Sequence, residues 1–280
     1  MTTTHESGDP AETSAKPPED TPAATPAPTR SARASRGAGV QLVLQPIVAL
    51  LLAAGVLLWA FVFHTLSATE RETLNASSLF ERIGQHIALT VVIVAVVVCV
   101  AVPLGVLVTR PGLTWLAPVV IGIGNIGQSA PAIGLLVLFY LWVGTSVAGF
   151  WVGVLPIAFY SLLPVLRNTV LGFQSVDPSL TDAGRGQGMS AVTVLRRVEL
   201  PLAVPFILAG LRTSLVLAVG TATLSFLVGA GGLGVLIDTG YKLRENSTLY
   251  VGALLAVALA LFVDWLGALA ERYLGPRGLR

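Results

Sequence analysis

The sequence predicts an all-α integral membrane protein with about six transmembrane helices. Hydrophobic residues make up 54% of the 280 residues and charged residues only 11%, whereas about a quarter of the residues in a soluble domain are charged. Several apolar runs are long enough to cross about 30 Å of hydrocarbon. A bilayer interior offers no hydrogen-bond partners to an open backbone, so each of these runs is expected to be helical.

The expected spans are six apolar runs, at residues 42–63, 87–108, 113–143, 148–166, 203–228 and 248–270. The third run is too long and too interrupted for one straight helix. Its centre carries Asn125, Gln128 and Ser129, followed by the helix breaker Pro131. Because irregular backbone at membrane depth occurs only against protein or a water-filled cavity, these four residues are candidates for lining a substrate pathway. The alternative is that their polar groups only bond neighbouring helices.

The first 36 residues contain six prolines among polar and small residues. Such a segment cannot bury enough apolar surface to offset the entropy of ordering it. The composition therefore predicts a disordered tail over residues 1–36. A cleaved signal peptide is the alternative, but the apolar run that follows has about 22 residues, whereas a signal core has about 7–15.

Residues 177–201 form a polar segment between two apolar runs. Asp177 can cap a helix that Pro178 begins, and glycines eight and ten residues after Pro178 end it. Ser190 can cap a second short helix, which Pro201 is expected to stop. A pair of small helices held just outside a membrane is typical of a docking element.

Arg212 lies inside the fifth apolar run, where a lone charge costs about 2.5–3.5 kcal/mol on insertion scales. Either the span begins later and Arg212 lies near the inner headgroups, or Arg212 lies within the bundle and lines the inner end of the pathway. Asp264 lies near the inner end of the last run, so an ion pair between the two residues is conceivable.

Basic residues are distributed unequally between the two sides of the expected spans, with eleven near the span ends on one side and four on the other. The eleven are Arg30, Arg33, Arg36, Arg110, Arg167, Arg185, Arg196, Arg197, Arg272, Arg277 and Arg280, and the four are Arg71, Arg82, Lys242 and Arg244. Positive charge marks the cytoplasmic side of a membrane protein. Both termini and residues 177–201 are therefore expected in the cytoplasm.

Residues 177–201 resemble the EAA loop of ABC importer permeases, the cytoplasmic element that binds the ATP-hydrolysing subunit. The family pattern is Glu-Ala-Ala, then a glycine and a later Leu-Pro pair. The corresponding residues are Asp182, Ala183, Gly184, Gly188, Leu200 and Pro201. Two of the first three letters differ, with Asp for Glu and Gly for Ala. The resemblance implies that these six residues couple the chain to an ATPase.

Residues 85–266 as a whole resemble the permease subunits of ABC importers for glycine betaine, choline and carnitine. The matching segments are residues 128–132, 163–169, 176–214 and 229–234. The resemblance implies a type I, MetI-like permease bundle in the bacterial cytoplasmic membrane. It also implies a second permease copy, two ATP-binding cassette subunits and an extracytoplasmic substrate-binding protein. ATP and Mg²⁺ are then expected on the partner ATPase, and no cofactor on this chain.

The resemblance also sets the expected organisation and substrate. The chain would hold a cytoplasmic tail (1–36), the first transmembrane helix with an outer loop (37–84), a permease domain (85–267) with a coupling loop at 173–202, and a cytoplasmic tail (268–280). The implied substrate is a quaternary ammonium osmoprotectant, namely glycine betaine, choline, carnitine or proline betaine. A permease for methionine or another amino acid is the alternative.

Other function classes have little support in the residues. The stretch 229–234 fits the dinucleotide pattern G-x-G-x-x-G, but it follows an apolar span rather than a strand. A glycine-rich re-entry or a close helix contact is expected there instead. The phosphate-binding loop of ATPases is absent, and the three histidines lack the spacing of metal ligands. An enzyme is therefore not expected, nor does a net charge of +2 indicate nucleic-acid binding.

The single cysteine, Cys99, lies in an apolar run and is expected to be buried. A channel that works without ATP would keep the six spans but need no ATPase.

Overall fold

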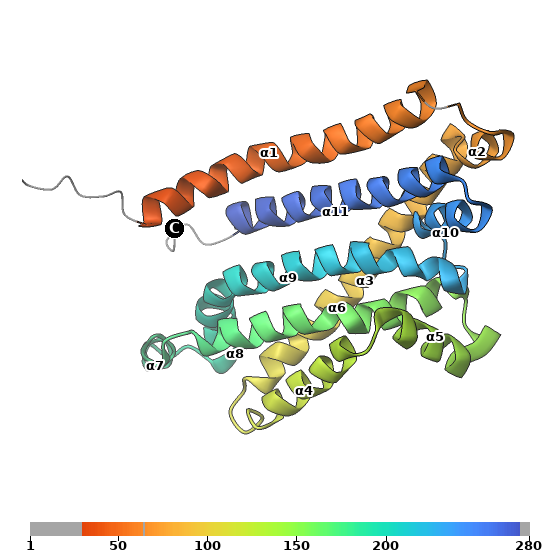
Figure 1. The fold of residues 1–280 in the computed structure, drawn as a ribbon. Helices are drawn as coiled ribbons and strands as arrows, with labels where there is room; N and C mark the ends of the chain where they lie inside the picture. Colours follow the sequence, from red (N-terminus) through yellow and green to blue (C-terminus); the bar gives the residue numbers. More distant parts are fainter. Residues whose placement is uncertain (1–29, 64, 275–280) are drawn as a thin grey trace, which may run out of the picture. The chain divides into compact units, whose positions relative to one another are not determined.

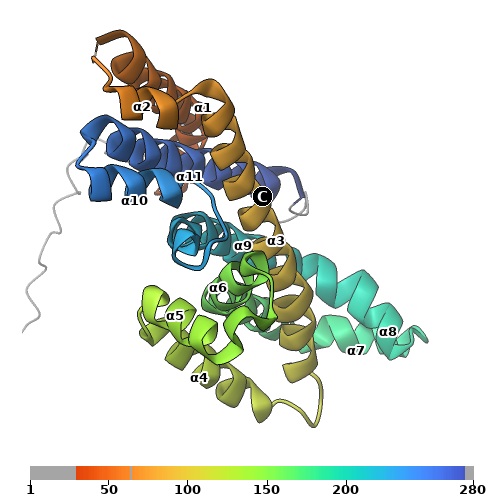
Figure 2. The same ribbon diagram turned by 90° about the vertical axis from the view of Figure 1, so that its right-hand side faces the viewer.

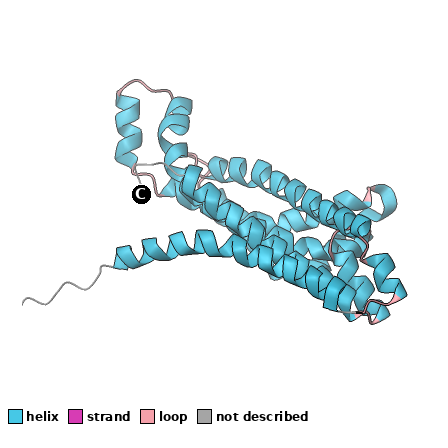
Figure 3. Cartoon of the chain, turned by 90° about the horizontal axis from the view of Figure 1, so that it is seen from above, coloured by secondary structure: helices cyan, strands magenta, loops and turns pink. Residues whose placement is uncertain are grey.

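The computed structural model describes residues 30–63 and 65–274, and every regular element within these ranges is a helix (Figures 1 and 3). The chain divides into two units, residues 1–38 and 39–280. The α-helices are α1 (Arg30–Leu58), α2 (Ala68–Thr73), α3 (Ala76–Val108), α4 (Leu116–Ser129), α5 (Ala132–Val143), α6 (Gly149–Gln174), α7 (Pro178–Gly186), α8 (Ala191–Val194), α9 (Leu200–Ala222), α10 (Gly234–Leu243) and α11 (Asn246–Leu274). Short π-helical or 3₁₀ segments are η1 (Trp59–Phe63), η2 (Gly144–Ser146), η3 (Leu195–Glu199) and η4 (Thr223–Val228).

Five helical segments are long and apolar enough to cross a membrane, namely Leu42–Val62, Ala76–Val108, Gly149–Gln174, Ala191–Val228 and Asn246–Leu274. Helices α4 and α5 count as a sixth span if taken together, although they are bent by 98° at the break between them. The prediction of an all-α membrane protein with about six spans is therefore confirmed. The prediction that the third apolar run is not one straight helix is confirmed as well.

The break in the third run is narrower than the sequence predicted. Residues 122–129 are regular helix, and only Ala130 and Pro131 leave it. Proline disfavours helical backbone in the residue before it, and Ala130 is extended, with φ −72° and ψ 142°. Gly124 of α4 serves helix packing instead, since a β-carbon added to it would lie 2.8 Å from Cδ1 of Leu163 on α6.

Helix α6 lies at the centre of the bundle and packs against α3, α4, α5 and α9 (Figure 2). The bundle core consists of fully buried aliphatic side chains from α3, α6 and α9, among them Ile93, Val97, Val165, Leu166 and Ala218. Small residues let the backbones approach closely, as is usual between membrane helices. A β-carbon on Gly210 of α9 would lie 2.7 Å from the carbonyl oxygen of Pro164 on α6.

Two short helices, α2 and α10, were not predicted from the sequence. Ser67 caps α2 by accepting a hydrogen bond from the N–H of Glu70 at 3.0 Å, and the Glu70 carboxylate accepts one from the N–H of Ser67 at 2.8 Å. This reciprocal pair is a capping box. Both helices lie at the end of the bundle opposite α7 and α8 (Figure 1).

Two further predictions need correction. The expected tail over residues 1–36 lies outside the described residues as far as residue 29, but residues 30–36 form the first turns of α1. Cys99 is exposed on the surface of α3 rather than buried, because the apolar run of this helix is hydrophobic on all sides and only part of it faces the core.

Candidate functional site

The segment between α6 and α9 forms two short helices beyond the ends of the bundle, at the same end as the carboxyl end of α11 (Figures 1 and 2). Asp177 caps α7 by accepting a hydrogen bond from the N–H of Ser179 at 2.8 Å, and Pro178 occupies the first turn. The same hydrogen bond lowers the pKa of the Asp177 carboxyl group, and negative charge is favourable at a helix N-terminus. The predicted start of this helix is confirmed.

Helix α7 ends in a turn that favours glycine. Gly188 has a φ of +81°, in the left-handed region that side chains with a β-carbon disfavour. Its N–H donates to the carbonyl of Arg185 at 2.9 Å, and the N–H of Met189 donates to the carbonyl of Gly184 at 3.1 Å. These two bonds are those of a Schellman motif, so the chain reverses here at a fixed angle.

Gly184 lies at the contact between the two short helices. It is buried, and a β-carbon added to it would lie 3.4 Å from Cγ2 of Val194 and 3.5 Å from Sδ of Met189. Val194, on α8, is itself 1% exposed. The contact therefore holds α7 against α8 through small and aliphatic groups.

Other residues of the two helices are exposed. Asp182, Ala183 and Gly188 are exposed. Two large apolar side chains are exposed as well, with Leu180 47% exposed on α7 and Val192 58% exposed on α8. An acidic residue and apolar side chains on a small helical pair form a surface suited to binding another protein.

The prediction that Pro201 stops the second short helix is wrong. Ser190 does cap α8, by accepting a hydrogen bond from the N–H of Thr193 at 3.3 Å. The chain then continues through the π-helical segment η3 into α9, and Leu200 and Pro201 form the first turn of α9. Proline lacks an N–H and clashes with the preceding turn of a regular helix. The wider π-helical turn before Pro201 accommodates its ring, so residues 191–222 are helical without interruption.

An ion pair joins this long helix, at the end of η3, to the carboxyl end of α3. Nη2 of Arg110, just after α3, lies 2.6 Å from Oε2 of Glu199. The Arg110 guanidinium also lies 5.4 Å from the ring centre of Phe173 on α6, within the range of a cation–π contact. Glu199 and Phe173 flank the two short helices in the sequence, so Arg110 fixes both ends of the segment.

The predicted pathway residues of α4 lie on successive turns beside α6. Gln128 Nε2 donates to the carbonyl of Tyr160 at 3.0 Å. Ser129 donates to the carbonyl of Asn125 in its own helix at 2.8 Å. Asn125 Oδ1 accepts a hydrogen bond from Nη2 of Arg167 on α6 at 2.5 Å. Pro131 follows as the exposed N-cap of α5.

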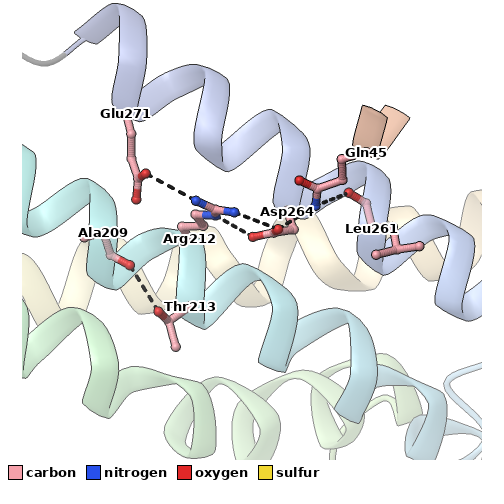
Figure 4. Close-up of polar contacts among 7 residues, drawn as sticks. All are labelled: Gln45, Ala209, Arg212, Thr213, Leu261, Asp264 and Glu271. Carbon is pink, nitrogen blue, oxygen red and sulfur yellow. Dashed lines mark hydrogen bonds and ion pairs between the residues drawn. The ribbon is translucent and has the colours of Figure 1, made fainter. Parts of the chain in front are cut away.

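Arg212 belongs to a separate polar cluster (Figure 4). Its Nε and Nη2 donate to the two carboxylate oxygens of Asp264 on α11 at 2.5 and 2.8 Å, and Nη1 lies 3.5 Å from the Glu271 carboxylate. Gln45 on α1 donates to Asp264 at 2.5 Å and to the carbonyl of Leu261 at 3.2 Å.

The Arg212–Asp264 pair that the sequence made conceivable is confirmed. Together with Gln45 it connects three helices, α1, α9 and α11. Arg212 also borders an apolar cavity of about 400 Å³ lined by α3, α9 and α11. The contacts of Arg212 are thus to α11, and none of them joins it to Asn125.

The glycine-rich stretch 229–234 is a tight turn against α3, in agreement with the expected close helix contact. Gly229, Gly231 and Gly232 all have positive φ. The N–H of Gly232 donates to Oε1 of Gln85 at 3.0 Å, and the N–H of Leu233 donates to Nδ1 of His86 at 3.3 Å.

Sequence reasoning missed the role of His86. The side chain is fully buried, and its Nε2 lies 3.1 Å from the carbonyl oxygen of Val219 on α9. Since Nδ1 accepts from Leu233, Nε2 carries the proton and donates to Val219. A neutral histidine with both ring nitrogens bonded joins three segments. The sole signal in the sequence was a histidine at the start of an apolar run.

Comparison with known proteins shows to which family the chain belongs. Residues 101–275 match the family model of the binding-protein-dependent transport system inner membrane component. The chain is 38% identical over 206 residues to the glycine betaine/carnitine/choline transport system permease protein OpuCB of Bacillus subtilis (strain 168), which covers 74% of this chain and 93% of that protein. It is also 38% identical over 213 residues to the osmoprotectant import permease protein OsmW of Salmonella typhimurium, which covers 74% of this chain and 96% of that protein.

Solved structures of similar fold come from ABC transporters. The inward-facing MetNI methionine ABC transporter matches with a TM-score of 0.63 and 26% identity, over 75% of this chain and all of that chain. An amino acid ABC transporter with histidines matches with a TM-score of 0.57 and 21% identity, over 75% of this chain and 99% of that chain, and shows the fold alone. The bundle is therefore of the MetI-like type, and the chain belongs to the family of binding-protein-dependent transport system inner membrane components.

Proposed function

We propose that this chain is the permease subunit of an ATP-driven, binding-protein-dependent importer of a quaternary ammonium osmoprotectant such as glycine betaine, choline, carnitine or proline betaine. The observation that carries the proposal is the 38% identity, over 74% of the chain, to permeases named for such compounds. The alternative, an amino-acid importer, has weaker support, because the methionine transporter structure is 26% identical.

In this proposal α7 and α8 bind the ATPase subunit. Asp182, Ala183 and Gly188 of this chain are proposed to contact the ATPase, and Gly184 packs α7 against Val194 of α8. ATP and Mg²⁺ are held by the ATPase and not by this chain. The exposed Leu180 and Val192 support this role, since apolar side chains on a surface helix gain stability when a partner covers them.

Movement of the ATPase would reach the membrane through α9. Gly184 packs on Val194, and the helix from residue 191 to residue 222 is unbroken and includes Leu200 and Pro201. At 1.5 Å per residue this helix is about 48 Å long. A push on α7 therefore moves the helix as one body, which supports a mechanism of alternating access.

The complete importer would hold two ATPase subunits, a second permease copy and an extracytoplasmic substrate-binding protein. The distribution of basic residues supports a bacterial inner-membrane location with both termini and α7 in the cytoplasm. The proposed permease domain spans residues 85–267, with the first helix and outer loop at 37–84 and a cytoplasmic end at 268–280. Helix α11 runs through the boundary at residue 267 as far as Leu274.

Asn125, Gln128, Ser129 and Pro131 are proposed to line the substrate pathway, because they lie at or shortly before the 98° bend between α4 and α5. Gln128 also joins α4 to α6, because its side chain donates a hydrogen bond to the carbonyl of Tyr160. A pathway role for Arg212 stays a prediction. Arg212 lies on α9 and bonds Asp264 of α11, so it would contribute to the pathway away from Asn125.

Uptake by reconstituted transporter tests the proposal. The chain is placed in liposomes with its ATPase and its binding protein, and uptake of labelled glycine betaine, choline, carnitine and methionine is measured with and without internal ATP. ATP-dependent uptake of at least one quaternary ammonium compound, and no uptake of methionine, is expected. Uptake of methionine alone would establish the amino-acid alternative, and uptake without the ATPase would establish a channel.

A further inference from the structure

Arg167 is a charged residue of α6 that bonds Asn125 of α4. Its Nη2 donates to Oδ1 of Asn125 at 2.5 Å. Arg167 lies seven residues before Gln174, the last residue of α6, which places it about 10 Å from the end of the helix. The bond therefore lies within the candidate span Gly149–Gln174, toward its carboxyl end.

The charge of Arg167 is not neutralised by the part of the chain that the structure describes. Arg110 and Arg212 each lie within 4.0 Å of a carboxylate, but no carboxylate of residues 30–63 and 65–274 forms an ion pair with Arg167. Its bonded acceptor is an amide oxygen. A guanidinium has five N–H donors in a planar fork, so most of its donors point away from Asn125.

The surroundings of the pair are open. Arg167 is exposed on the surface of this chain, as is Leu171 one turn along α6, and Ile126 next to Asn125 is 74% exposed. A charged side chain in a membrane span lies against protein or a water-filled cavity, because contact with acyl chains is costly. The face that α4 and α6 present around Arg167 is therefore one that meets water or a partner in the assembled permease.

We propose that Arg167, held by Asn125, binds the carboxylate of a zwitterionic osmolyte as it passes through the membrane. This inference rests on the proposed function. Glycine betaine and carnitine each carry a carboxylate, whereas choline carries a hydroxyl group in its place. A guanidinium binds a carboxylate through two parallel hydrogen bonds, and it cannot bind a hydroxyl in that way.

Asn125 is the positioning residue of the pair. Its Oδ1 holds one edge of the guanidinium, which leaves another edge to meet the carboxylate. Its own amide nitrogen provides two further donors. The pair also lies close to the 98° bend between α4 and α5, because Asn125 is four residues before Ser129, the last residue of α4.

The test compares substrates in one assembly. The transporter with its ATPase and saturating loaded binding protein is reconstituted as wild type, Arg167→Gln and Arg167→Lys, and initial uptake of labelled glycine betaine, carnitine and choline is measured. Arg167→Gln is expected to lower uptake of the two carboxylate compounds about tenfold relative to choline, since a charged hydrogen bond is lost. Arg167→Lys keeps the charge and is expected to retain part of the preference.

A matched control is Arg71→Gln, which removes an exposed arginine from α2 and should leave all three rates unchanged.

An equal fall for all three substrates in Arg167→Gln, at normal membrane levels, would show that Arg167 serves packing or gating and would overturn the inference. Unchanged rates would overturn it too. A wild type that carries choline but neither carboxylate compound would also overturn it while leaving the proposed function standing. Uptake of methionine alone would instead remove the proposed function.

Discussion

Arg212 on α9 and Asp264 on α11 form a two-point ion pair, with hydrogen bonds of 2.5 and 2.8 Å between guanidinium and carboxylate. Gln45 of the first span donates to the same carboxylate at 2.5 Å. Trp265, the next residue of α11, donates to the carbonyl of Leu42 at 2.8 Å. The first span, which precedes the matched family region of residues 101–275, is thus attached to α11 by hydrogen bonds beside this ion pair.

Removing either partner of this pair is expected to destabilise the protein, and the two losses are expected not to be additive. Arg212→Met leaves the Asp264 carboxylate without its cation, and Asp264→Asn leaves the guanidinium with only Glu271, so each should cost about 1–3 kcal/mol. The double variant should cost less than the sum of the two. The free energy of unfolding in detergent micelles, measured for all four proteins, gives the coupling. Strictly additive losses would mean that the pair contributes nothing to stability.

Reversing the charge of Asp182 is expected to uncouple the ATPase. Asp182→Lys places a cation on the exposed face of α7 without touching the contact at Gly184. Insertion should be normal, while uptake and the ATPase activity stimulated by loaded binding protein both fall. Tyr273→Lys, which adds a cation at the exposed carboxyl end of α11, is the control. Normal transport in Asp182→Lys at normal membrane levels would remove this residue from the coupling surface.

Two glycines of the same loop are expected to respond differently to alanine. Gly188 has a φ of +81° with no neighbour near its missing β-carbon, whereas Gly186 is in regular helix with equally open space. Gly188→Ala should therefore cost about 1 kcal/mol in backbone strain, and Gly186→Ala should be neutral or slightly stabilising. Hydrogen–deuterium exchange of residues 178–198 measures the difference. Equal protection in the two variants would contradict the left-handed turn.

Cysteine labelling distinguishes pathway lining from helix contact in α4. Cys99 is exposed and must first be replaced. Cysteine at Asn125 or Ser129 is then expected to react with small water-soluble thiol reagents, and the rate should change when nonhydrolysable ATP holds the ATPase closed. Cysteine at Gly124, which packs against Leu163, should stay unreactive. No reaction at either polar position, in variants that still transport, would leave these residues as packing groups only.

The sequence predicts best where a single residue has a strong local effect. Asp177, Pro178 and Ser190 fixed the starts of the short helices correctly, because capping depends on nearby atoms alone. Pro201 gave a wrong prediction, because its local effect was taken to stop a helix. A proline is compatible with the first turn of a helix as well as with its end, and the choice depended on the π-helical turn before it.

Contacts between distant segments could not be predicted in the same way. The pair of Arg212 and Asp264 joins residues 52 positions apart, and the facing of two helices decides whether they meet. His86 gave even less signal, because its partners are backbone groups of Val219 and Leu233, which any sequence supplies. Helix α10 is only 10 residues long, too short to stand out among apolar spans.

The corner between α4 and α5 has a consequence for the biosynthesis of the protein. The two helices have 14 and 12 residues, about 21 and 18 Å at the helical rise, so neither is long enough to cross the hydrocarbon alone. Each also ends at the corner in backbone groups that have no partner within the helix. Helix α6, which packs against both, is synthesised after them. Stable insertion of residues 116–143 is therefore expected to wait until residues 149–174 have left the ribosome, and a nascent chain cut short before α6 should remain accessible to protease at this corner.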